Sequence, residues 1–143
     1  MKTATRSLCI AALAALVPLS ASAANMKPTS VKLHLSNRFM HSKAMMHSTG
    51  TAKLHWTKGD IGIKLTTDGL PAASQLGKRA YVLFATDGQM TTRVGALTAH
   101  GMMAGTSGMV MMTKLSDLYL YAESSANAKK PGTGVLVMSA MVG

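Results

Sequence analysis

Methionine and histidine gather in three segments of this 143-residue chain, which contains 13 methionines and five histidines. Thioether sulfur and imidazole nitrogen are ligands that suit Cu(I), and both bind it as neutral groups without releasing a proton. The first two segments therefore raise the hypothesis of a Cu(I) site. Its candidate ligands are Met40, His41, Met45, Met46 and His47 in the first segment and His100, Met102 and Met103 in the second.

Core filling is the competing interpretation, because methionine is flexible and fills irregular gaps in a hydrophobic core. The chain has only one Trp, three Tyr and two Phe, so methionine must supply part of the core volume. Both interpretations stay open for the methionines of the first segment, because that segment is a polar loop and loops lie at the surface. The methionines that we expect to pack in the core are Met109, Met111, Met138 and Met141.

Catalytic chemistry has little support in the sequence. Of the five carboxylates, only Asp117 and Glu123 flank an expected strand, and they stand at its two ends, whereas acid-base pairs share a cleft. The glycine-rich segment 105–108 lacks the lysine of a phosphate-binding loop. A zinc site is disfavoured because His41 and His47 are the only histidines at the usual close spacing. We expect a protein that is not an enzyme.

The first 23 residues read as a cleavable signal peptide. Two basic residues precede the uncharged run Leu8–Leu19, and Ala21-Ser22-Ala23 follows as a small-x-small cleavage site. The apolar run is too short for a membrane span, which needs about 20 residues. Removal of the peptide takes away two basic residues and the single cysteine, so the formal charge falls from +10 to +8. We expect a periplasmic or secreted protein with no transmembrane segment in its mature chain.

The positive charge restricts the class of partner. Nucleic acid is a poor partner, because too few aromatic side chains are present for base stacking. A charge of this size favours weak attraction to an anionic membrane or envelope polymer, or simply keeps the protein soluble. The partner that we expect is an unidentified protein or envelope ligand.

Alternating apolar and polar residues indicate β-strands rather than helices. His34 and His55 fall on the polar faces of two such strands, where we expect ordinary solvated side chains. Turn residues separate the strands, and residues 37–49 form a long basic loop. The pattern predicts an all-β fold, a single antiparallel β-sandwich of seven or eight strands. The expected strands are 31–35, 52–56, 61–65, 80–85, 92–98, 108–113, 118–122 and 135–142, with 80–85 and 135–142 central because they are apolar on both faces.

From residue 50 onward the order of motifs resembles the extracytoplasmic C-terminal domain of anti-sigma-K factors. The motifs are Gly50-Thr51-Ala52, Asp68-Gly69-Leu70-Pro71, the strand Gly77–Phe84, Val94–Leu97, and Tyr119–Glu123 followed by Pro131–Gly134. The resemblance implies a β-sandwich at 50–143 that receives signals outside the membrane, preceded by a strand and the Met/His-rich loop at 24–49. Only the predicted signal peptide at 1–23 stands where typical members carry a sigma-binding segment and a transmembrane helix. We therefore expect a stand-alone binding or sensing module that does not itself hold a sigma factor.

Overall fold

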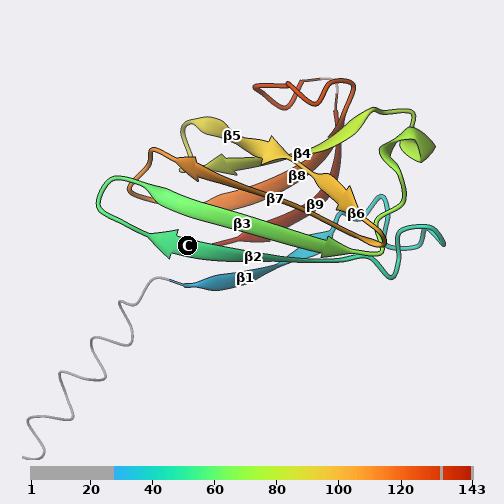
Figure 1. Cartoon of the computed structure of the whole chain (residues 1–143), viewed down its shortest axis with the longest axis horizontal. Helices are drawn as coiled ribbons and strands as arrows, with labels where there is room; N and C mark the ends of the chain where they lie inside the picture. The colour runs from blue at the N-terminus through green and yellow to red at the C-terminus, as the bar shows by residue number, and fades with distance from the viewer. Residues whose placement is uncertain (1–27, 133, 143) are drawn as a thin grey trace, which may run out of the picture.

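The computed structural model describes residues 28–132 and 134–142, so the predicted signal peptide lies outside the described residues. The described chain is all-β, which confirms the predicted fold class (Figure 1). One short 3-10 turn, η1, is the single helical element in this part of the chain, and no helix there is long and apolar enough to cross a membrane. The strands are β1 Ser30–Leu35, β2 Thr49–Trp56, β3 Ile61–Asp68, β4 Ala80–Thr86, β5 Thr91–Ala96, β6 Thr98–His100, β7 Met103–Val110, β8 Asp117–Glu123 and β9 Val135–Met141, and η1 spans Ala73–Leu76.

All nine strands of the described chain belong to one antiparallel sheet that curls into a nearly closed barrel. The strand order is β5-β4-β8-β9-β1-β2-β3-β7-β6. Strand β1 joins the two layers, because its first part pairs with β2 and its last two residues pair with β9. The described chain has one strand more than the eight expected. This additional strand is β6, whose three residues are too few to show an alternating pattern.

Two glycines let the barrel approach closure between β5 and β7. A Cβ added to Gly95 would overlap the side-chain oxygen of Thr106, and one added to Gly108 would overlap the backbone oxygen of Val94. Glycine is used where two backbones approach this closely, because any side chain would separate them. The two layers therefore meet along a glycine-lined seam.

The alternating segments bury their apolar faces as predicted. Residues Ile61, Ile63 and Leu65 of β3 are buried, and Lys64 between them is exposed. The predicted central strands are also confirmed, because β4 lies between β5 and β8, and β9 lies between β8 and β1. The hydrophobic core sits between the two layers of the barrel.

The methionines expected in the core divide into two groups. Met138 is fully buried, as predicted, but Met109, Met111 and Met141 are exposed, so the prediction is wrong for these three. Met109 lies on the outer face of β7, and the residue directly opposite it on β3 is Gly62. Met111 follows the end of β7 and Met141 is the last residue of β9, so neither has a strand above it. The expected strand at 108–113 is displaced to β7, because β7 follows β3 along its whole length.

Residues 37–48 form a chain of tight turns that closes one end of the barrel. Backbone hydrogen bonds link Phe39 to Ser36 at 2.9 Å, Ser42 to Phe39 at 3.1 Å and Met45 to Ser42 at 3.1 Å. Phe39 and Met45 point into the core, and Met45 is completely buried. The loop therefore packs as part of the same core as the strands.

Candidate metal-binding groove

Gly69 joins the two Met/His segments at one end of the barrel, the right-hand end of Figure 1. The Ser48 hydroxyl donates to the backbone oxygen of Gly69 at 3.0 Å, and the backbone N–H of Gly69 donates to the backbone oxygen of Met102 at 3.0 Å. The backbone of Gly69 has φ of 78°, a left-handed conformation that favours glycine. The 37–48 loop and the β6–β7 hairpin, which begins fifty residues after the loop ends, are thus held side by side.

A groove between the 37–48 loop and strands β1 and β2 brings two thioethers and one imidazole together. Met40 and Met46 reach it from the loop, and His34 reaches it from the outer face of β1. The groove is open and measures about 640 Å³, far more than one ion needs, so these side chains must close over any bound ion. Methionine suits this role, because its three rotatable bonds let the sulfur move while the backbone stays fixed.

Two thioethers and one imidazole are donors of the kind that suit a soft, singly charged metal ion. Met40 is 52% exposed and Met46 is 47% exposed, so both sulfurs are accessible from solvent. Among the described residues, no three His, Cys, Asp or Glu side chains gather into a metal-sized group. Any metal site at this end therefore depends on methionine sulfur, which is the donor that favours Cu(I).

A second, smaller pair of soft donors lies on the neighbouring hairpin. His100 of β6 stands directly opposite Met103 of β7, and the two line one groove together with Lys64. Met102, at the tip of the hairpin, lines a different pocket beside Leu70. Of the second predicted segment, His100 and Met103 are thus brought together, and Met103 also lines the pocket that contains Met102.

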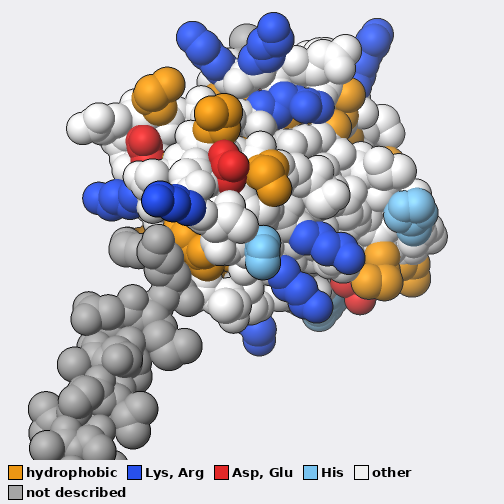
Figure 2. All heavy atoms as spheres, turned by 60° about the vertical axis from the view of Figure 1, so that its left-hand side comes forward, with side chains coloured by type: hydrophobic (Ala, Val, Ile, Leu, Met, Phe, Trp, Pro, Cys, Tyr) orange, Lys and Arg blue, Asp and Glu red, His pale blue; other side chains and the backbone are white. Residues whose placement is uncertain are grey.

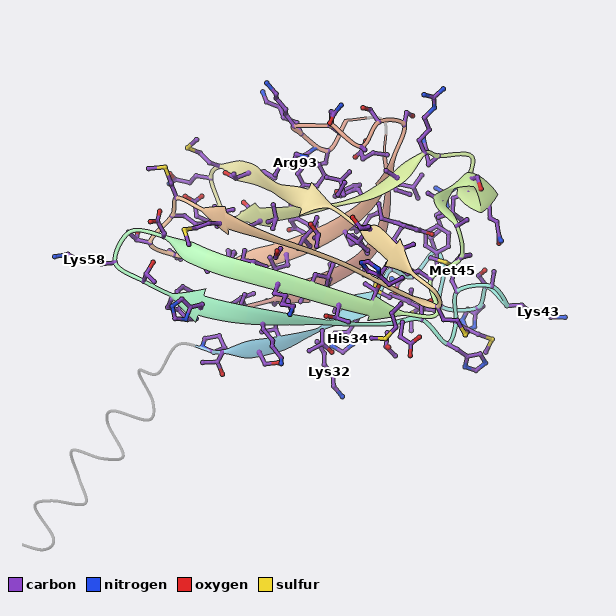
Figure 3. All side chains as sticks on the ribbon, viewed as in Figure 1. Lys32, His34, Lys43, Met45, Lys58 and Arg93 are labelled. Carbon is purple, nitrogen blue, oxygen red and sulfur yellow. The ribbon has the colours of Figure 1, made fainter. Side chains whose placement is uncertain are left out.

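Of the two interpretations left open for the methionines of the first segment, core filling is the correct one for Met45. Its side chain is 0% exposed and packs in the core, because the turns of the loop aim position 45 inward and positions 40 and 46 outward. Figure 3 shows Met45 at the closed end of the barrel and Lys43 pointing away from it. His41 and His47 are exposed but lie outside the lining of the groove.

His34, which we expected to be an ordinary solvated side chain, lines the groove. A single histidine on the polar face of a strand carries no signal of its own. The 37–48 loop follows β1 directly, and its turns bring Met40 and Met46 to the groove that His34 also lines. His41 and His47, by contrast, stand next to methionines in the sequence, which is the pattern that predicts a ligand.

The outer face around the groove is basic. Lys32 lines the groove beside His34, and both rise from the same side of β1 (Figure 3). Lys53 and Lys64 stand directly opposite each other on β2 and β3. Since these ammonium groups repel cations, an ion held here gains most from neutral donors and low charge, which again favours Cu(I) over a divalent ion.

The two strand-flanking carboxylates do not form a catalytic pair. Asp117 and Glu123 occupy opposite ends of β8, about 20 Å apart at ~3.3 Å per residue. Glu123 is buried, and burial raises its pKa above the ordinary value of 4.5, although the charge of Lys78 and a backbone hydrogen bond from Gly132 favour the ionised form. The carboxylate lies against Gly134, where no side chain would fit.

Comparison of the chain with known protein families, curated proteins and solved structures finds no match. The resemblance to the anti-sigma-K extracytoplasmic domain therefore stays a prediction from its motifs, and the groove must be interpreted from its own residues.

Proposed function

We propose that this chain is a non-enzymatic, exported binding module whose ligand is Cu(I), held in the groove between the 37–48 loop and β1. The ligands are the sulfurs of Met40 and Met46 and one ring nitrogen of His34. The observation that carries the proposal is the convergence of these three soft donors, from β1 and the loop that follows it, on one open groove. Three neutral donors make a complete coordination set for a soft monovalent ion.

His100 and Met103 act as auxiliary donors on the adjacent hairpin. Because Gly69 ties the hairpin to the loop, both donor sets face the same end of the barrel. An ion leaving one groove therefore has a second pair of soft donors nearby, which suits a protein that buffers or passes on copper rather than one that uses it for catalysis.

A sensing role is compatible with this proposal. The motif resemblance implies a domain that receives signals outside the membrane, and copper occupancy of the groove would be the signal. A partner protein then recognises the closed state of the 37–48 loop. A pull-down from an envelope extract with and without Cu(I) tests this part: capture of the same protein in both conditions, or of none, would count against a copper-dependent partner.

The copper proposal is tested by anaerobic titration of the mature protein with Cu(I) against a competing chelator. We expect the variant Met40→Leu/Met46→Leu to bind at least ten-fold more weakly than wild type, about 1.4 kcal/mol. The matched control is Met90→Leu/Met111→Leu, which removes two exposed methionines from the other end of the barrel. A wild-type dissociation constant in the millimolar range, or equal losses in both variants, would refute the proposal.

A further inference from the structure

Every large hydrophobic side chain that is exposed within residues 28–132 and 134–142 is a methionine. Methionine is normally among the more buried residue types, and any aliphatic side chain would serve if the surface needed only apolar area. The feature that these exposed side chains have in common is therefore a thioether sulfur. The exposed methionines are Met40, Met46, Met90, Met102, Met103, Met109, Met111 and Met141.

Three of them, which we call the distal methionines, lie at the end of the barrel opposite the groove. Met90 is 68% exposed, Met111 is 88% exposed and Met141 is 83% exposed. The backbone of Ser116 binds their segments together, with 2.8 Å hydrogen bonds to the last residue of β4 and to the residue after β9. Figure 2, which turns the left-hand end of Figure 1 forward, shows hydrophobic side chains standing among acidic ones there.

The neighbours of the distal methionines do not favour a soft metal. Asp87 shares the β4–β5 turn with Met90, and Asp117 stands opposite Met141 in the β8–β9 register. Carboxylate oxygen is a hard donor, and it suits calcium or magnesium rather than copper. An exposed thioether that does not bind a metal can still react with an oxidant and accept an oxygen atom.

We propose that the exposed methionines are sacrificial acceptors of two-electron oxidants of the hypohalous acid class, such as hypochlorous acid. The sulfur lone pair attacks the oxygen of the acid, the S–O bond forms, the O–Cl bond breaks, and chloride and a proton leave to water. The thioether is oxidised by two electrons to the sulfoxide, and the oxidant is reduced to chloride. Each exposed methionine consumes one equivalent.

Burial explains why the fold survives this reaction. A sulfoxide is polar, so at an exposed position water satisfies its oxygen, whereas in the core the oxygen would lack a partner. Met45, Met112 and Met138 are buried beneath the strands and the 37–48 loop, and the oxidant cannot reach them without opening the barrel. The described chain thus separates eight accessible sulfurs from three protected ones.

Stepwise oxidation of the metal-free mature protein tests the proposal. Hypochlorous acid is added in sub-stoichiometric steps, sulfoxide is assigned to each methionine by peptide mass mapping, and the fold is followed by circular dichroism. We expect the eight exposed positions to convert first with no loss of the folded signal. The variant Met90→Leu/Met111→Leu/Met141→Leu should take up three oxygen atoms fewer than wild type before its core methionines react.

The matched control is Met45→Leu, a volume-conserving change at a protected position. It should take up as many oxygen atoms as wild type. Oxidation of Met45 or Met138 at the same dose as the distal methionines, or unfolding before the exposed positions are converted, would overturn the proposal. Since no copper is present, the result is independent of whether the groove binds Cu(I).

Discussion

Two adjacent methionines of the 37–48 loop are expected to have opposite roles, and replacing each by alanine separates them. Met45 is 0% exposed and packs with the core, whereas its neighbour Met46 is half exposed and lines the groove. Truncating a fully buried methionine removes its packing contacts and leaves a cavity, which costs about 2–5 kcal/mol. At roughly 4 °C per kcal/mol for a domain of this size, Met45→Ala should lower the Tm by about 8–20 °C.

Met46→Ala should change the free energy of unfolding by less than about 0.5 kcal/mol, because the side chain already contacts solvent. Its affinity for Cu(I) should fall at least ten-fold, because one of three sulfur and nitrogen donors is lost. Urea unfolding and chelator competition measure the two quantities on the same preparations.

A third variant guards against an indirect effect of core damage on the loop. Met45→Leu keeps the volume and removes only the sulfur, at a cost below about 1.5 kcal/mol. It should therefore bind Cu(I) as wild type does. Loss of copper affinity in Met45→Leu, or wild-type stability in Met45→Ala, would contradict the separate roles of the two side chains.

Two further predictions concern the seam and the buried carboxylate. Gly108→Ala should destabilise the fold by about 1–3 kcal/mol in urea unfolding, because the new Cβ would overlap the backbone of Val94, while the control Gly62→Ala meets only ordinary contacts and should be neutral. Equal stability of the two variants would show that the seam is not closely packed. Because burial raises the pKa of Glu123, the folded state holds its proton more tightly, and the resulting stabilisation is full below pH 4.5 and lost as the pH rises through the raised pKa. Glu123→Gln should thus increase the free energy of unfolding at pH 7 and have little effect at pH 4; the same increase at both pH values would exclude titration as the cause.

The strands were predictable because alternation is a local property of a chain. Leu33, Leu54 and Ile63 are each separated from the next apolar residue by one intervening residue, and a strand with one buried face requires this spacing. The central strands were equally predictable, because β4 and β9 are apolar on both faces. The short β6 and the glycine-rich part of β7 lack such a pattern, and only their pairing with neighbours reveals them.

The location of each methionine followed from tertiary structure, because its side chain suits either a core or a surface. Met138 and Met141 belong to the same strand, yet Met138 is buried and Met141 is exposed, because residues three apart point to opposite faces and Met141 is the last residue of β9. Met45 and Met46 differ for a similar reason, because consecutive turns aim neighbouring side chains in opposite directions.

Composition and period alone were enough to predict an all-β chain rich in soft donor atoms. Which donors share a groove was decided by the turns of the 37–48 loop, which bring Met40 and Met46 to the side of β1 that carries His34, and by Gly69, which ties that loop to the β6–β7 hairpin. The contacts of Gly69 join residues far apart in sequence, and their free energy depends on the whole barrel closing rather than on any local pattern.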